Sequence, residues 1–346
     1  MSRYIVHKKS GTYSELLETY GLANLLHKIF DAVNLPDTDV VITDKEYCFE
    51  VSTSIDITDD IISKLKYFPP FKYIKQKAES DVSNYPDYYD YPKQNEWKKE
   101  RQKMLNEAYK LKDAGDKQKE IERINTIFEA EKMMDVEYDV YSQIQSKKND
   151  TFGGFDKLYL NFHNNKNCFS RIIKSILCYY QEGQFTDDVT PIFKKTKSDT
   201  ITAYQFFNPN KGQGLREAKA KISRKNFDAL WITETMKFSG ALSDMICQLV
   251  KVGSGFDLKI FVPEYKQLTF QKKYELITNF KKYTKGNTPI KIDVLCILLL
   301  TKVLIENTGF SGRRRKIKDI VSGLHSVYQK NGAKKIHYKY WFYSNS

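Results

Sequence analysis

The spacing of apolar residues changes from helical to strand-like within the first 51 residues of this chain. Between Glu15 and Phe30 they recur at three- and four-residue intervals, which predicts an amphipathic helix with Ser14 as its cap. The short apolar segments Asp39–Ile42 and Tyr47–Val51 surround a turn at residues 43–46, which predicts a hairpin. We therefore expect an α+β protein with a mixed N-terminal domain, a helical insertion and a helical C-terminal part.

Shifts in composition divide the chain into four expected regions. They are an N-terminal α/β region (residues 1–95), a charged helical insertion (96–150), a central α/β region (151–266) and a helical C-terminal region (267–346). The insertion carries one apolar face and a break near Gly115, so it is either a solvated helical hairpin or an arm that docks on another protein. The acidic and aromatic segment Ser80–Lys93 before it is predicted to be an irregular connection.

The same periodicity arguments predict further elements. Helices are expected at Asp59–Leu65, Phe169–Tyr180, Phe238–Val250, Thr269–Tyr283, Pro289–Ile305 and Arg314–Tyr328. Strands are expected at Ala203–Phe207, Ala229–Ile232 and Phe256–Val262, the last of them ending at Pro263. The tail Lys334–Tyr343 alternates imperfectly and is predicted to be a final strand or helix.

The chain is strongly basic. It has 346 residues, 56 Lys and Arg against 43 Asp and Glu, a net charge of +13 and a pI near 9.2. A surplus of this size indicates an anionic partner, most often nucleic acid, although a generally lysine-rich proteome would also raise the charge. The 24 Tyr and 21 Phe residues can stack on bases or fill cores and interfaces.

Cysteine usage and hydropathy suggest a protein of the reducing cytoplasm. The five cysteines are odd in number and form no CxxC pair, which argues against a disulfide framework or a zinc knuckle and favours buried thiols. Residues 1–10 lack the apolar stretch of a signal peptide. The most apolar segment, Val294–Ile305, is too short to span a bilayer.

A basic loop with two glycines, residues 208–225, carries the most specific chemistry. Gly212 and Gly214 allow close backbone approach, while Lys and Arg suit phosphates and Asn and Gln can read base edges. The loop lacks the Gly-Lys-Ser/Thr of a Walker motif, and Glu217 breaks the GxGxxG fingerprint. The alternative is an ordinary polar turn before a charged helix. The candidate nucleic-acid-binding residues here are Asn208, Asn210, Lys211, Gln213, Arg216, Lys219, Lys221 and Arg224.

A second basic cluster comprises Arg313, Arg314, Arg315 and Lys316, at the start of a predicted helix. Positive charge at a helix N-terminus opposes the helix dipole, so local stability does not explain it. An external phosphate would explain it, since N–H groups at a helix end and Arg side chains both bind anions. A solvated charged turn is the alternative.

Catalysis is the weaker hypothesis. Asp244, Asp257 and Lys259 are spaced like the D…(D/E)xK pattern of metal-dependent nucleases, in which two carboxylates hold Mg²⁺ and a lysine positions water; Glu234 and Lys237 could join them. Such a short pattern arises by chance in a lysine-rich chain. The five histidines are scattered, and no nucleophile elbow is present. We therefore expect no enzyme activity, no catalytic or metal-binding residues and no cofactor.

Two groups of motifs resemble one family. The first is Tyr20-Gly21-Leu22-Ala23-Asn24-Leu25-Leu26 followed by the strands Val40–Asp44 and Tyr47–Val51. The second runs from Phe207-Asn208-Pro209-Asn210-Lys211-Gly212-Gln213-Gly214 through Ala218-Lys219-Ala220 to Leu230–Gly240, with Asp257-Leu258-Lys259 after it. Together they cover about a third of the chain. They are similar to the large subunit of type I CRISPR effector (Cascade) complexes, in its smaller members.

The resemblance implies a non-catalytic subunit of an antiviral surveillance complex. Such a subunit contacts the 5′ handle of the guide RNA, recognises the target-adjacent motif (PAM) in double-stranded target DNA and helps recruit a helicase-nuclease. The remaining sequence is read by RNA–DNA pairing. The implied partners are thus guide RNA, duplex DNA, other Cascade subunits and the helicase-nuclease, and Asn208, Lys211, Gln213 and Arg216 would lie near nucleic acid. The alternatives from the residues alone are the nuclease above and a DNA-binding scaffold without RNA.

Overall fold

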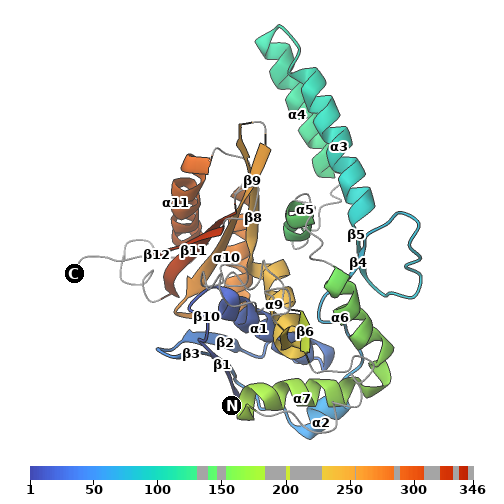
Figure 1. The fold of residues 1–346 in the computed structure, drawn as a ribbon, viewed down its shortest axis with the longest axis vertical. Helices are drawn as coiled ribbons and strands as arrows, with labels where there is room; N and C mark the ends of the chain where they lie inside the picture. Colours follow the sequence, from blue (N-terminus) through green and yellow to red (C-terminus); the bar gives the residue numbers. More distant parts are fainter. Residues whose placement is uncertain are drawn as a thin grey trace, which may run out of the picture.

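Two four-stranded sheets and a pair of buried helices organise the chain in the computed structural model (Figure 1). The structure describes residues 1–130, 139–145, 153–183, 200–202, 228–253, 255–283, 289–307, 320–329 and 335–341. Helices and strands both occur in the N-terminal and the C-terminal parts of these ranges, so the predicted α+β class is confirmed.

The N-terminal sheet has the strand order β1-β3-β2-β10. Its strands are β1 (Arg3–His7), β2 (Val40–Asp44), β3 (Cys48–Thr53) and β10 (Gln267–Thr269), and all neighbours are antiparallel. The β2–β3 pairing confirms the predicted hairpin. Alternate residues such as Val40 and Ile42 are buried, as expected for a sheet with one covered face. Because β10 comes from the C-terminal part, strands far apart in the sequence contribute to one sheet.

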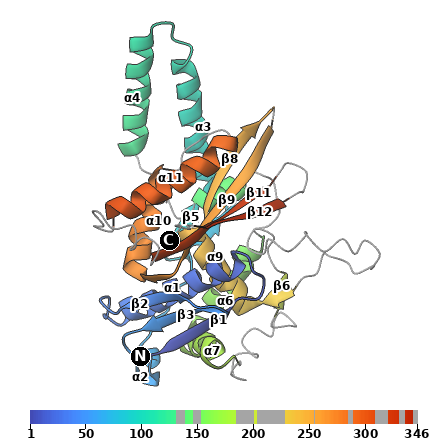
Figure 2. The ribbon, with the colours of Figure 1, turned by 90° about the vertical axis from the view of Figure 1, so that its left-hand side faces the viewer.

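The second sheet has the order β12-β11-β9-β8, again antiparallel. It consists of β8 (Ile246–Val252), β9 (Gly255–Tyr265), β11 (Val321–Gln329) and β12 (Lys335–Trp341). Helix α11 (Pro289–Asn307) packs on α10 (Phe270–Tyr283) and lies beside this sheet (Figure 2).

Three predictions for this region are wrong. The helix expected at Phe238–Val250 is α9, at Trp231–Asp244; Met245 is extended and the next residues pair with β9 as a strand. The helix expected at Arg314–Tyr328 is replaced by strand β11 from residue 321. Strand β9 does not end at Pro263 but continues to Tyr265. It tolerates proline there because β8 begins opposite Phe261, so one side of β9 is unpaired at that point. The C-terminal part is therefore mixed rather than purely helical, with β12 as its last strand.

Helix α1 (Ser14–Ala32) crosses α9 at the centre of the core, with almost no space between the two backbones. A Cβ atom on Gly21 would lie 1.8 Å from the carbonyl oxygen of Met236, and one on Gly240 would lie 1.9 Å from that of Leu17. Only glycine allows this approach. Ser14 does not cap α1 as predicted; the N-cap is Tyr13, and Ser10 instead donates to Glu15 from its backbone and its hydroxyl.

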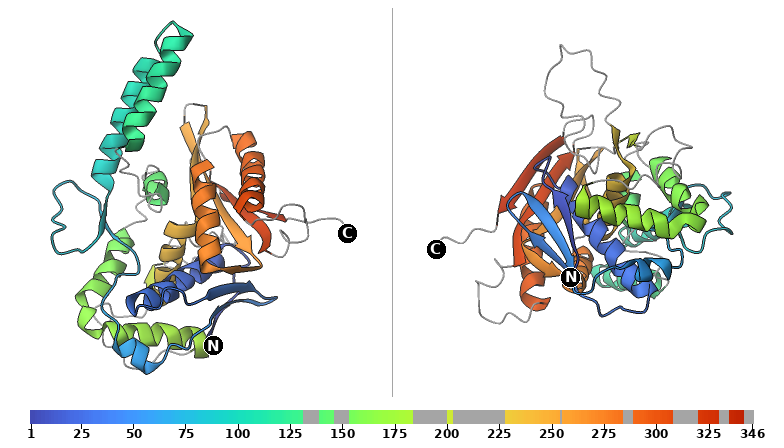
Figure 3. Two further views of the ribbon diagram at one scale, coloured as in Figure 1. Left: turned by 180° about the vertical axis from the view of Figure 1, so that it is seen from behind. Right: turned by 90° about the horizontal axis from the view of Figure 1, so that it is seen from below.

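The remaining elements surround this core. They are α2 (Asp59–Ser63), β4 (Tyr73–Lys75), β5 (Tyr88–Asp90), α5 (Asp139–Gln145), α6 (Gly153–Asn164), a 3₁₀ turn at Lys166–Cys168 and α7 (Phe169–Glu182). Helix α7 lies along β1 when the molecule is seen from below (Figure 3, right). The connection at residues 80–93 is less irregular than predicted, because it contains β5 and the start of α3, and Tyr85 stacks on Tyr73 with ring centroids 4.0 Å apart.

The predicted insertion forms an antiparallel helical hairpin of α3 (Tyr91–Ala108) and α4 (Ala114–Ala130). It projects from the rest of the protein (Figures 1 and 3). Its interior is a separate apolar cluster of Leu105, Ala108, Ile124 and Phe128. We call this hairpin the arm.

Two further predictions concern cysteines and membranes. All five cysteines are free; Cys247 and Cys296 are buried, whereas Cys48, Cys168 and Cys178 are half-exposed, so the prediction of buried thiols holds for two of five. None of the helices that the structure describes combines the length and apolar character needed to cross a bilayer.

Candidate functional site

The segment that contains the basic glycine loop is bounded by the two strands of a short β-ribbon. Strand β6 (Thr200–Thr202) pairs antiparallel with β7 (Asp228–Leu230), with Thr200 opposite Leu230. Strand β7 runs directly into α9 at Trp231, whose ring packs edge-on against Phe162 at 5.9 Å. The loop is therefore anchored at the N-terminal end of α9.

The predicted binding residues themselves lie outside the described residues. This holds for Asn208, Asn210, Lys211, Gln213, Arg216, Lys219, Lys221 and Arg224 between β6 and β7. It also holds for Arg313, Arg314, Arg315 and Lys316, which lie between α11 and β11. The structure thus identifies the elements that hold both segments and leaves their contacts as predictions.

A cluster of buried charged side chains lies in the first half of α9, where this helix packs against α1. Glu234 and Lys237 form an ion pair of 3.1 Å one turn apart on α9, and both are buried. Glu18 of α1 is also buried and accepts a hydrogen bond of 3.0 Å from the Tyr180 hydroxyl. Burial raises the pKa of Glu18 to about 6, partly offset by the Lys237 ammonium. Burial lowers the pKa of Lys237, but the Glu234 and Glu18 carboxylates outweigh it and raise that pKa overall.

A second buried ion pair lies at the other end of α9. The Asp244 carboxylate is 2.6 Å from the Lys273 ammonium of α10, and both side chains are almost fully buried. Lys273 also donates to Asn24 of α1 at 3.3 Å and lies over the ring of Tyr20. This pair joins three helices across the core. Removing one member would leave an uncompensated charge, so the pair holds the helices in one arrangement.

Asp244 and Asp257, the two carboxylates of the nuclease hypothesis, are not brought together, although Asp257 and Lys259 both contact Tyr328. Asp257 accepts a 2.5 Å hydrogen bond from the Tyr328 hydroxyl, and Lys259 forms a 2.6 Å ion pair with Asp293. Asp257 of β9 lies opposite Val250 of β8, whereas β8 begins at Ile246. Val250 is four residues, or roughly 13 Å, from that first residue, and Asp244 comes before it in the chain. Two carboxylates that share a Mg²⁺ must each lie about 2.1 Å from it. Asp244 and Asp257 therefore form separate polar contacts rather than a shared metal site.

Two histidines of the described part of the chain each lie beside one carboxylate. Within those ranges no set of three His, Cys, Asp or Glu side chains is arranged to hold a metal. His325 is buried and lies 3.1 Å from the Glu264 carboxylate. His27 lies 3.4 Å from Asp31, one turn away on α1. Both contacts fit structural roles.

Two of the segments named for the resemblance meet in space, whereas residues 207–220 lie outside the described residues. Tyr20–Leu26 belongs to α1 and Leu230–Gly240 ends within α9, and Gly21 and Gly240 form their crossing. Within Leu230–Gly240, the buried ion pair of Lys237 thus lies three residues before the glycine of the crossing. These motif residues are buried and contribute to the packing of α1 on α9.

Comparison with known proteins adds no relative. A scan against protein-family models finds no match, and a search of curated proteins finds none either.

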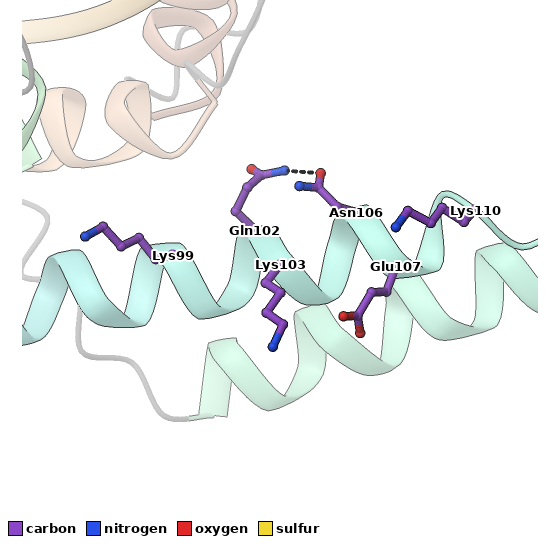
Figure 4. Close-up of a pocket in the computed structure, with 6 residues that line it drawn as sticks. All are labelled: Lys99, Gln102, Lys103, Asn106, Glu107 and Lys110. Carbon is purple, nitrogen blue, oxygen red and sulfur yellow. Dashed lines mark hydrogen bonds between the residues drawn. The ribbon is translucent and has the colours of Figure 1, made fainter.

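One polar surface is not marked by any motif of the sequence. The outward face of α3 carries lysines, side-chain amides and glutamates, among them Glu96 and Glu100. A shallow pocket on this face is lined by Lys99, Gln102, Lys103, Asn106, Glu107 and Lys110 (Figure 4). A helical projection of residues 95–110 would have shown them on one side. Only the structure shows that α4 covers the opposite side and leaves this one to solvent.

Proposed function

We propose that this chain is a non-catalytic, nucleic-acid-binding subunit of a CRISPR-guided antiviral surveillance complex that works in the cytoplasm. The observation that carries the proposal is the glycine loop rich in Lys, Arg, Asn and Gln, which lies in sequence between β6 and β7, two strands that pair with each other at the start of α9. Connections that leave from a rigid scaffold often carry the binding residues of a protein.

In this proposal the loop meets the target-adjacent motif in duplex DNA or the 5′ handle of the guide RNA. Lysines and arginines hold phosphates, and Asn208, Asn210 and Gln213 approach base edges. The Arg313–Lys316 segment supplies a second cationic region. The other subunits carry the guide, and a recruited helicase-nuclease carries out cleavage. The net charge of +13 supports this role, as does the separation of Asp244 from Asp257.

Helix α11 supports a chain that works in an assembly. One of its faces packs into the core through Ile292, Cys296 and Leu300, while Val294 and Leu298 on another face are 59% and 62% exposed. A helix that is apolar on all sides is usually covered on all sides. Contact with a neighbouring subunit would provide that cover.

The first test is purification of the native assembly. We expect small RNA and several different subunits to accompany the chain. The proposal fails if the purified assembly is free of RNA and does not bind duplex oligonucleotides at low salt. RNA-free material that still binds duplex DNA would support the scaffold alternative.

The second test concerns the loop. Lys211→Ala with Arg216→Ala removes two charges, so the slope of log K against log salt for duplex DNA should flatten by up to about 1.8. Lys251→Ala with Lys272→Ala is the matched control, since both lysines are exposed and lie outside the two cationic segments. An equal effect of the two variants would assign binding to overall charge. Arg313→Ala, Arg314→Ala and Arg315→Ala together should lower nucleic-acid retention in the same assay; unchanged retention would assign that cluster to solvent.

A further inference from the structure

Helix α11 lies on the outer side of the second sheet and packs inward with one of its faces (Figures 1 and 2). The buried side chains of that face are Ile292, Cys296, Leu300, Val303 and Leu304. Asp293 fixes the start of the helix to the sheet, because its carboxylate lies 2.6 Å from the Lys259 ammonium of β9 and accepts a 3.2 Å hydrogen bond from Ser326 of β11. The inward face of α11 therefore has its partners within this chain.

The outward face of α11 carries a line of apolar side chains. Val294, Leu298 and Ile305 are exposed, and the half-buried Thr301 completes the line. Steps of four, three and four residues separate these positions, which is the spacing along the contact line of two paired helices. The line spans about 16 Å, or three turns. We call it the α11 seam. Among the side chains that the structure describes, no other helix places three exposed large apolar residues on one line.

Helix stability does not account for the seam. Valine and isoleucine are less favourable than alanine inside a helix, because their branched side chains lose rotamer freedom against the preceding turn. Single exposed apolar residues are common on protein surfaces, whereas contiguous ones mark interaction sites. A partner that covers Val294, Leu298 and Ile305 would supply the hydrophobic free energy that their exposure to water withholds.

The charges beside the seam do not suit a polyanion. Within residues 292–307 the one exposed cation is Lys302, and its ammonium lies 3.7 Å from the Glu306 carboxylate. A nucleic acid or an anionic membrane would need an excess of lysine and arginine on this face. The chemistry of the seam is therefore that of a protein contact.

The spacing and the size of the seam identify the kind of protein segment. Side chains at three- and four-residue steps interdigitate with those of another helix, whereas an added strand needs a free sheet edge, and α11 lies over a sheet face. A second copy of this chain is disfavoured, because each copy carries a net charge of +13. A stable dimer also takes about 800 Å² and about 20 to 30 residues from each partner, far more than three turns of one helix offer. The occupant is thus a helix of a different protein, which is held by further contacts as well.

We propose that the α11 seam is the docking surface for an amphipathic helix of another subunit. The two helices would pair over about three turns at the shallow crossing angle of about 20° that this spacing favours, with Leu298 near the centre of the contact. The proposal rests on the proposed function only in requiring an assembly, because the seam contains none of the predicted nucleic-acid-binding residues.

The test uses the full chain in its native assembly, with the photo-reactive amino acid benzoylphenylalanine in place of Leu298. The control carries the same amino acid in place of Tyr274, which is exposed on the neighbouring helix α10. We expect irradiation to join position 298 to a helical segment of a different, copurifying subunit with apolar residues at three- and four-residue steps. Position 274 should leave that segment unlabelled.

A charge at the seam should release the same subunit. Leu298→Asp should lower the amount of that subunit in the purified assembly at least about tenfold, because burial of one leucine contributes about that factor or more. The matched variant Tyr274→Asp should leave the amount unchanged. Circular dichroism should show the wild-type helix content in both variants, since both positions are exposed.

Other results would overturn the docking surface. These are a cross-link from position 298 to a second copy, to another part of the same chain or to nucleic acid, the absence of any cross-link there, and equal amounts of the subunit in Leu298→Asp and Tyr274→Asp. An assembly that contains RNA and binds duplex DNA but gives no cross-link at position 298 would leave the proposed function standing without this surface. A cross-linked partner helix in an assembly that lacks RNA and does not bind duplex DNA would support the docking surface and refute the proposed function.

Discussion

Replacing Gly240 by alanine gives the sharpest test of the fold. The new Cβ would lie 1.9 Å from the Leu17 carbonyl oxygen and 2.9 Å from the Gly21 nitrogen, and ordinary contact begins near 3.4 Å. Helices α1 and α9 would therefore have to separate by about 1.5 Å along their contact. Overpacking of a well-packed core costs about 1 to 3 kcal/mol, and here the cost lies at or above the upper end because neither backbone can rotate away. Part of this cost is offset, because alanine is about 1 kcal/mol more favourable than glycine inside a helix.

We therefore expect Gly240→Ala to lower the free energy of unfolding by about 2 kcal/mol or more. Urea denaturation followed by circular dichroism would measure this as a lower midpoint. The control is Gly115→Ala, an exposed glycine of α4 whose added Cβ would meet only the end of the Asp113 side chain, at 3.1 Å. That variant should change stability by less than about 1 kcal/mol.

The pair of glycines offers a further check. Gly21→Ala makes the same kind of clash, with the Met236 carbonyl oxygen at 1.8 Å. Once one substitution has separated the helices, the second meets less resistance, so the double variant should lose less than the sum of the two singles. A Gly240→Ala protein as stable as the wild type, or strict additivity with Gly21→Ala, would refute the close crossing.

Two other substitutions probe the buried charges. Lys273→Met leaves the Asp244 carboxylate buried without its partner and should lower the free energy of unfolding by about 3 to 5 kcal/mol in the same urea assay. Adding Asp244→Leu should restore most of that loss. A single variant as stable as the wild type would contradict the buried pair. Burial raises the pKa of Glu18 from 4.5 to about 6, so the folded chain holds this proton more tightly and the contribution of Glu18 to stability falls as the pH rises between those values. The free energy of unfolding of Glu18→Gln, relative to that of the wild type, should therefore rise by about 2 kcal/mol as the pH rises from about 4 to 7. A difference in free energy that does not change with pH would argue against the raised pKa.

Local patterns predicted the elements whose signals are local. The helix at residues 15–30, the hairpin at residues 39–51 and the helices at residues 169–180, 269–283 and 289–305 all agree with the structure to within a few residues. Their apolar spacing and turn residues lie within one or two turns of each other, so the sequence expresses them directly. The prediction at residues 238–250 failed beyond Asp244 because apolar residues such as Ile246, Leu249 and Val250 suit a helix as well as a strand. Pairing with β9 decides between them.

The candidate site divides in the same way. The sequence by itself determined the excess of cationic groups, the glycine loop and the Arg-rich segment, because charge and backbone freedom belong to each residue whatever the fold. Only the tertiary structure decided that Gly21 meets Gly240, that Asp244 pairs with Lys273, that Asp244 and Asp257 lie apart, and that α4 leaves one face of α3 exposed. These relations join residues distant along the chain. They depend on packing among many side chains at once, and no local pattern of the sequence encodes them.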